Sequence, residues 1–205
     1  DIHVWMLTGD KQITAENIAK SCRLHKETSE LLDLSNDEPT NTVTKIKEKL
    51  KDLVENGLEG KDNEITLIID GKSLVHALEE EIRTEFIRLC TSCKAVICCR
   101  VSPLQKAEMV ELVSNYTKAI TLAIGDGAND VAMIQKASVG VGVSGNEGLQ
   151  AVNSADFSIG QFSYLLRLLL VHGAWNYARI SNVILYSFYK NITLYIIELW
   201  FAIYS

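Results

Sequence analysis

Two carboxylates stand four residues apart on a glycine-rich turn, in the run Gly125-Asp126-Gly127-Ala128-Asn129-Asp130. The turn follows the apolar segment 120–124, which is typical of a buried strand. Carboxylate oxygens are the hard ligands that Mg²⁺ prefers, and the amide of Asn129 could orient a water or a phosphate. We therefore expect Asp126 and Asp130 to hold Mg²⁺. The simpler alternative is a capped turn in which Asp130 serves only as a helix N-cap.

Two further strand-end runs offer groups for a phosphoryl ligand. Thr8-Gly9-Asp10 follows the apolar segment 2–7 and supplies a hydroxyl, backbone amides and a carboxylate at the start of a helix. The run from Arg100 to Lys106 follows the apolar segment 95–99. A lysine in the first turn of a helix is unfavourable for the helix dipole, so Lys106 predicts an anion nearby. A solvated surface lysine is the alternative.

Two other patterns suggest different chemistry and are weaker. Asp70 ends the apolar segment 65–69 and could be an aspartyl nucleophile, but Lys72 stands where a second acid or a small residue is expected. A turn carboxylate is the better interpretation. Gly140-x-Gly142-x-x-Gly145 matches a dinucleotide pattern, but its first two glycines lie within a predicted strand and no acid follows about 20 positions later. Nicotinamide or flavin binding is therefore disfavoured.

The five cysteines do not resemble a secreted disulfide framework, because their number is odd and Cys98-Cys99 are adjacent. They favour a reducing compartment. Cys90-x-x-Cys93 has the spacing of half a metal site, but no second Cys or His pair stands at ligand spacing. We expect these cysteines to be buried structural thiols.

Apolar strands alternate with helices along most of the chain. Apolar strands without internal alternation, separated by helices, indicate an α/β fold with a parallel sheet covered on both faces. In such sheets, binding sites lie beyond the carboxyl ends of the strands. The predicted strands are 2–7, 65–69, 95–99, 120–124, 138–143 and 156–159, and the predicted helices are 11–22, 73–90, 103–115, 128–136 and 147–153.

Charge is distributed unevenly along the chain. With 20 Lys and Arg against 26 Asp and Glu, the net charge of −6 argues against a general nucleic-acid binder. Residues 26–64 contain seventeen charged positions out of thirty-nine. Within them, apolar residues at positions 43, 46, 50, 53 and 54 follow helical spacing, from Asn41 or Thr42 to a stop at Gly57. We expect a surface insertion with its own amphipathic helix.

Residues 161–205 contain no proline and one glycine, which predicts a near-continuous helix. Val183–Tyr204 has 22 residues, 17 of them apolar, and reaches the roughly 20 residues needed to cross a bilayer. We expect a stalk over 161–182 and a transmembrane helix over 183–204. Polar residues on it should face protein or a wet cavity. The alternative is a long buried hairpin in a soluble bundle. The polar residues are Ser187, Lys190, Asn191, Thr193 and Glu198.

Taken in order, Thr8-Gly9-Asp10, Lys106 and residues 125–130 resemble the phosphorylation domain of P-type ATPases, which has a haloacid-dehalogenase-like, Rossmann-like fold. The surrounding sequence resembles the type IV branch, the phospholipid flippases. The resemblance covers nearly the whole chain except residues 26–64, and implies that residues 1–160 are a partial phosphorylation domain. The segments that carry it are TGDKQITAENIA (8–19), CCRVSPLQKAEMV (98–110), GDGANDVAMIQKASVGVGVSGNEGLQAVNSADFSIGQF (125–162) and LLLVHGAWNYARI (168–180).

This resemblance implies a role for each site residue. Lys106 and Asp126 would support the phosphoryl chemistry, and Asp126 and Asp130 would hold Mg²⁺. Contacts to ATP or to the phosphoryl group are implied for Thr8, Gly9, Asp10, Arg100, Lys106, Asn129 and Asp130.

The resemblance also implies partners and a location. The predicted transmembrane helix would be the family's fifth, with Lys190 and Asn191 along the path of the lipid headgroup. The substrate would be a phospholipid, and an accessory subunit would accompany the chain. Residues 1–182 would lie on the cytoplasmic side of an integral membrane protein.

One departure limits what this chain can do alone. The family's nucleophile is the Asp of a DKTGT motif, and residues 1–205 contain no such motif. We expect it upstream of residue 1, and we expect no ATPase activity from this chain in isolation. In the parent protein, ATP would phosphorylate that Asp, and dephosphorylation would drive lipid to the cytoplasmic leaflet. The alternatives are a P-type cation pump, a soluble phosphohydrolase using Asp70, and a non-catalytic membrane-tethered protein.

Overall fold

Parallel strands in two sheets organise the chain, whose computed structural model describes residues 2–26, 29–35, 38–58, 63–145 and 149–204. The first sheet has the strand order β1-β4-β3-β2 and the second β5-β6-β7, and every pair is parallel. The strands are β1 Val4–Leu7, β2 Glu30–Asp33, β3 Asn63–Asp70, β4 Cys93–Cys99, β5 Leu122–Gly125, β6 Val139–Val143 and β7 Phe157–Ile159.

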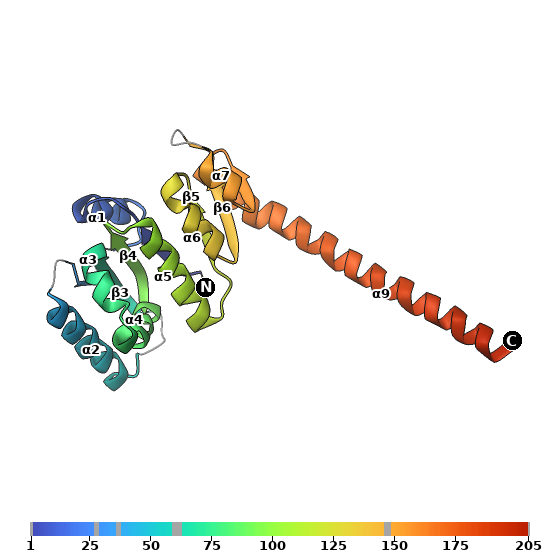
Figure 1. The fold of residues 1–205 in the computed structure, drawn as a ribbon, viewed down its shortest axis with the longest axis horizontal. Coiled ribbons are helices and arrows are strands. Elements are labelled where there is room, and N and C mark those ends of the chain that lie inside the picture. Colours follow the sequence, from blue (N-terminus) through green and yellow to red (C-terminus); the bar gives the residue numbers. More distant parts are fainter. Residues whose placement is uncertain (1, 27–28, 36–37, 59–62, 146–148, 205) are drawn as a thin grey trace.

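Helices connect the strands, as Figure 1 shows. In the register of the first sheet, Leu7 pairs with Cys98 and Asp70 pairs with Cys99, so β1, β3 and β4 end at the same edge. The helices before residue 160 are α1 Gln12–Ser21, α2 Pro39–Glu55, α3 Gly71–Ala77, α4 Glu80–Ser92, α5 Pro103–Thr117, α6 Val131–Lys136 and α7 Gln150–Ser154.

Both faces of the first sheet are buried. Leu67 and Ile69 of β3 point into a large core that α2, α3, α4 and α5 complete. The intervening Ile68 points to the other face, where it packs with Ala15 and Ala19 of α1. Successive side chains of a strand point to opposite faces, so an unbroken apolar strand needs cover on both sides. The predicted α/β fold, with helices flanking parallel strands, is confirmed.

The second sheet forms its own core. Ala123 of β5 packs with Met133 and Ile134 of α6 and with Ala151 of α7, and Leu7 of β1 contacts the same cluster. We expected one continuous sheet, and in this respect the prediction differs from the structure. In the described residues β1 pairs only with β4 and β5 only with β6, so each stands at the edge of its own sheet.

The charged segment 26–64 is more than a surface insertion, so that prediction is wrong in part. It contributes β2, which pairs in parallel with β3, and Leu34, which is fully buried in the main core. The amphipathic helix exists as α2 and begins earlier than expected, at Pro39. Its buried face includes Ile46 and Leu53. Four-residue β2 lacks a continuous apolar run, which is why sequence pattern alone missed it.

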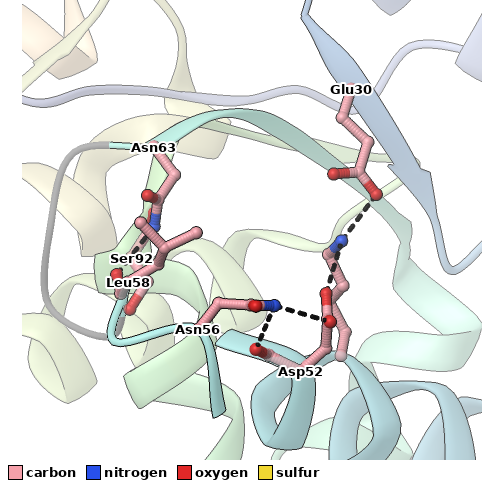
Figure 2. Close-up of polar contacts among 7 residues, drawn as sticks. Glu30, Asp52, Asn56, Leu58, Asn63 and Ser92 are labelled. Carbon is pink, nitrogen blue, oxygen red and sulfur yellow. Dashed lines mark hydrogen bonds and ion pairs between the residues drawn. The ribbon is translucent and has the colours of Figure 1, made fainter. Parts of the chain in front are cut away.

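Polar contacts hold this segment on the sheet (Figure 2). The Lys49 ammonium lies 2.6 Å from Glu30 Oε1 of β2, linking α2 to the edge strand. At the start of β3, Asn63 Nδ2 donates to the carbonyls of Leu58, at 2.8 Å, and Ser92, at 3.1 Å. The amide side chain thus joins Leu58, just after α2, to Ser92 at the end of α4.

The predicted helix over 73–90 is two helices. Asp70 caps α3, and the chain then leaves helical geometry at Glu79, which has φ −60° and ψ 144°, before α4 begins. The predicted helix over 147–153 overlaps α7, and its first two residues lie outside the described residues.

The last segment of the chain is largely one helix. A 3₁₀ turn over Phe162–Tyr164, one short turn over Leu165–Arg167 and a π-helical turn over Leu168–His172 lead into α9, Gly173–Tyr204. Figure 1 shows α9 projecting away from both sheets, and none of its residues is buried. The near-continuous helix is therefore present, without a break where stalk and span were expected to meet.

Among the described residues, no helix is both long enough and apolar enough to cross a membrane. Residues 183–204 all lie within α9, and their crossing of a membrane stays a prediction. The seventeen apolar positions include four tyrosines and Trp200, whose polar groups lower the apolar character of the helix. Lys190 and Glu198 lower the apolar character further.

Four of the five cysteines are buried as predicted, and Cys22 is exposed. Burial raises the pKa of the Cys98 thiol to about 12, and burial likewise raises the pKa of Cys93 to about 12. A thiol reacts as the thiolate, so raised pKa values and lack of access both slow reaction.

We predict that only Cys22 of the native chain reacts rapidly with a water-soluble disulfide reagent at about pH 8, the range in which an exposed thiol is partly ionised. The other four should react only after denaturation. Thiol titration with and without denaturant measures this, and a Cys22→Ser variant provides the control. Fast reaction of a second thiol in the native chain would contradict the burial described here.

Candidate functional site

The turns after β1 and β4 are joined by backbone hydrogen bonds. Arg100 N–H donates to the Asp10 carbonyl at 3.0 Å, and Val101 N–H donates to the Thr8 carbonyl at 3.2 Å. The Thr8 hydroxyl accepts from Asp10 N–H at 3.1 Å, which closes the turn between them. Two of the three runs singled out by sequence are therefore held side by side at the carboxyl edge of the first sheet.

The third run meets the second through an ion pair. Lys106 Nζ of α5 lies 2.8 Å from Asp130 Oδ1, at the end of the 3₁₀ turn Ala128–Asp130 that follows β5. The two side chains are only 9% and 13% exposed. The sequence predicted an anion near Lys106, and in this structure Asp130 is that anion. The pair connects the carboxyl edges of the two sheets.

A capping box sets the position of Lys106. The Ser102 side chain accepts from Gln105 N–H at 3.3 Å, while the Gln105 side chain accepts from Ser102 N–H at 2.9 Å. Pro103 at the first helical position fixes the backbone direction. These bonds satisfy helix N–H groups that otherwise lack partners, and they fix the first turn of α5 on which Lys106 stands.

Glycines make room for the acidic turn. A Cβ added to Gly125 would overlap the Asp130 side chain, so glycine is required for Asp130 to fold back over the end of β5. A Cβ at Gly145 would lie 3.6 Å from Asp126 Cβ, which brings the loop after β6 next to Asp126. The carboxylate of Asp126 itself is exposed, as is Asn129.

The predicted site residues fall into two groups. Thr8, Gly9, Asp10, Arg100, Lys106, Asp126, Asn129 and Asp130 all lie on turns at strand carboxyl ends or on the first turn of α5. Lys190 and Asn191 lie on α9, which leads away from these turns (Figure 1). The structure thus gathers the residues predicted for phosphate and Mg²⁺ near one edge and keeps the residues predicted for the lipid path apart.

The acidic turn has the donors that suit Mg²⁺, though not a full ligand set. No three His, Cys, Asp or Glu side chains in the described part of the chain are grouped to hold a metal ion. Mg²⁺ is commonly held by one or two carboxylates, with waters and substrate phosphates completing its shell. Exposed Asp126 and the second carboxylate oxygen of Asp130, Oδ2, fit that pattern.

Asp70 is poorly placed for a nucleophile. It is 1% exposed, and its Oδ1 accepts from Ser73 N–H at 3.0 Å as the cap of α3. Its Oδ2 has no hydrogen-bond partner among the described residues. This geometry supports the interpretation of Asp70 as a turn carboxylate and disfavours the phosphohydrolase alternative.

Sequence reasoning missed Gln105, which bonds to two different loops. Besides the cap, its Nε2 donates to the Gly71 carbonyl at 2.6 Å. The signal was available, because Ser102-Pro103-Leu104-Gln105 has the spacing of a capping box. The link to Gly71 needs the tertiary fold and has no signature in the sequence.

Two family models match this chain. Residues 2–161 match the model described as haloacid dehalogenase-like hydrolase. The chain belongs to the haloacid dehalogenase-like hydrolases. Residues 152–205 match the model described as phospholipid-translocating P-type ATPase C-terminal. The second model begins before the first ends, so the two together span nearly all of the chain.

Curated relatives agree with the second model. The chain is 57% identical to phospholipid-transporting ATPase tat-1 of Caenorhabditis elegans, 53% to phospholipid-transporting ATPase DRS2 of Saccharomyces cerevisiae and 47% to phospholipid-transporting ATPase ID of Homo sapiens. Each match covers 98% of this chain but 15–18% of the relative. The predicted resemblance to phospholipid-transporting P-type ATPases is confirmed, and the chain spans less than a fifth of these relatives.

We predict that Asp130→Asn lowers the free energy of unfolding by roughly 2–3 kcal/mol, because it leaves the Lys106 ammonium buried without its carboxylate. The double variant Lys106→Met/Asp130→Asn should recover most of that loss. Urea denaturation of the purified chain measures both.

The matched control is Glu55→Gln, which breaks the exposed pair of Lys51 and Glu55. That change should cost about 0.5 kcal/mol or less. If Asp130→Asn were as mild as Glu55→Gln, the ion pair between the two sheets would contribute little to stability.

Proposed function

We propose that this chain works within an ATP-driven phospholipid translocase that forms an aspartyl-phosphate intermediate. The observation that carries the proposal is the Lys106–Asp130 ion pair, set beside the bonded turns that follow β1 and β4. A phosphoryl group carries several negative oxygens, and its transfer needs cations placed before the reaction begins. The relatives, which are phospholipid-transporting ATPases by name, support the lipid as substrate.

The chain's own groups would divide the work of binding the phosphoryl group. Thr8 would donate its hydroxyl to a phosphoryl oxygen, and the amides of Gly9 and Asp10 lie on the same turn. Lys106 would share its charge between Asp130 and the transferred phosphoryl. Arg100 and Asn129, both exposed, would contact the nucleotide of ATP.

Asp126 and Asp130 would hold Mg²⁺. Bound there, the ion would neutralise phosphoryl oxygens as negative charge shifts during transfer. With a second cation beside the Asp130 carboxylate, Lys106 would be able to pair with the phosphoryl group as well as with Asp130. If Asp130 pairs with both Lys106 and Mg²⁺, an acid and a lysine can stand together at a site that binds a phosphoryl group.

The nucleophile would enter from outside this chain. We propose that a strand carrying the phosphorylated Asp lies between β1 and β5. Both are parallel edge strands, and Leu7 already contacts the core of the second sheet. Both are also incompletely covered, since Val4 is 49% exposed and Leu122 40% exposed. An apolar edge strand left open is a site for pairing with a further strand.

The lipid would meet the chain on α9. We propose that Lys190 and Asn191 contact the phospholipid headgroup, because an ammonium and an amide can bind phosphate and glycerol oxygens. Movement would be toward the cytoplasmic leaflet, with residues 1–182 on the cytoplasmic side, where ATP is available. The rest of the protein would supply the remaining membrane path and bind an accessory subunit.

We predict that the natural protein carrying this chain forms an acid-stable, hydroxylamine-sensitive phosphoenzyme from ATP and Mg²⁺. Asp126→Asn should reduce the initial rate of its formation at least about a hundredfold, because a developing charge loses its counter-ion. Labelling with radioactive ATP followed by acid quench measures this. The chain 1–205 alone, which lacks the nucleophile, should incorporate no label and turn over no ATP.

Serum raised against residues 26–64 identifies the natural protein in carbonate-washed membranes, where we expect a band several-fold heavier than 22.8 kDa. Absence of a phosphoenzyme in that protein would contradict the proposal. So would Mg²⁺-ATP turnover by residues 1–205 that Asp126→Asn abolishes, since the reaction would then need no outside nucleophile.

A separate prediction concerns the lipid. Lys190→Ala in the natural protein should leave phosphoenzyme formation intact and raise the phospholipid concentration for half-maximal ATPase stimulation roughly tenfold, as expected for one lost charged hydrogen bond. Added phosphatidylserine, phosphatidylethanolamine and phosphatidylcholine are the probes. Lys190→Arg keeps the charge and is the control. Unchanged stimulation in the alanine variant would rule out the headgroup role.

A further inference from the structure

Gln105 stands where the turns after three strands meet. Its Oε1 accepts from Ser102 N–H at 2.9 Å, just after β4, and its Nε2 donates to the Gly71 carbonyl at 2.6 Å, just after β3. One amide side chain therefore bridges two neighbouring strand ends. A capping box needs only the first of these bonds, so the second requires another explanation.

The contacts of Gln105 extend, through Gly71, to the turn after β1. A Cβ on Gly71 would overlap the Arg100 carbonyl, so the backbones of Gly71 and Arg100 lie in close contact. Arg100 has φ +52°, in the left-handed region that non-glycine residues adopt only when surroundings enforce it. Its N–H donates to the Asp10 carbonyl at 3.0 Å. Gly71, held by Gln105, thus supports Arg100, and Arg100 holds Asp10.

The next residue along α5 is Lys106. Its ammonium is paired with Asp130 at 2.8 Å, and the residue is 7% exposed. The side chain of a lysine is long and flexible, so its placement depends on where the helix turn that carries it is fixed. Gln105 fixes that turn through both atoms of its amide, because Oε1 bonds to Ser102 and Nε2 bonds to Gly71.

We propose that Gln105 is a positioning residue of the phosphoryl site. Through Gly71 and Ser102 it sets Lys106 against Asp130 and keeps Arg100 bonded to Asp10. This inference rests on the proposed function for its effect on the reaction. Its effect on Lys106 stands independently of that function.

Two variants separate this role from simple helix capping. Gln105→Glu retains an acceptor for Ser102 N–H, as in the common Ser-x-x-Glu box, but cannot donate to the Gly71 carbonyl. Gln105→Met removes both bonds without adding charge. The matched control is Leu104→Ala, in the same helical turn, where the side chain is exposed. Thermal unfolding confirms that each variant is folded.

The first measurement follows Lys106 itself in the natural protein. Amine-reactive labelling, quantified by peptide mass spectrometry, should proceed several-fold faster at Lys106 in both Gln105 variants and unchanged in Leu104→Ala. Equal labelling in Gln105→Glu and the unsubstituted protein would overturn the proposal, because it would reduce Gln105 to a helix cap. If Gln105→Met fails to fold, Gln105→Glu still decides.

The second measurement is the rate of phosphoenzyme formation against ATP concentration. A misplaced Lys106 should lower the maximal rate about tenfold and leave the half-saturating ATP concentration nearly unchanged. An unchanged maximal rate would overturn the catalytic part of the proposal. Should the unsubstituted protein form no phosphoenzyme, the proposed function fails, and the labelling result still decides whether Gln105 positions Lys106.

Discussion

The ion pair between Lys106 and Asp130 is the contact on which the site depends. Each partner is more than four-fifths buried, and each follows a different sheet. Nearly buried charges are tolerated only when paired, so the two carboxyl edges are held in register by an electrostatic requirement as well as by packing. Two local features make that contact possible. Gly125 leaves space for the Asp130 side chain, and the capped first turn of α5 fixes the position of Lys106.

Much of the site could be predicted because its chemistry is local in sequence. Thr8-Gly9-Asp10 and the acidic turn each follow an apolar strand directly, and parallel strands bring their carboxyl ends to one edge. The two-sheet arrangement could not be predicted, because whether β1 and β5 pair depends on distant segments. Strand β2 was missed for a related reason: its short, mixed sequence becomes a strand only against the exposed edge of β3.

The C-terminal helix shows what composition alone leaves open. Counting apolar residues treats Tyr186 and Leu185 alike, although a phenol hydroxyl requires a hydrogen-bond partner and an isobutyl group does not. The lack of proline and the single glycine correctly predicted a helix over residues 173–204. The environment of a helix is a different question from its formation, and the sequence pattern addresses only the second.

The π-helical turn Leu168–His172 lies directly before α9 and is the point at which this long helix bends most easily. A π turn widens the backbone and weakens its hydrogen bonds, so bending is easiest there. With 32 residues at 1.5 Å each, α9 is about 48 Å long. A tilt of about 10° at its base would displace its far end by about 8 Å, by the same geometry. A small change of angle at the base of α9 would therefore be a large displacement at its far end.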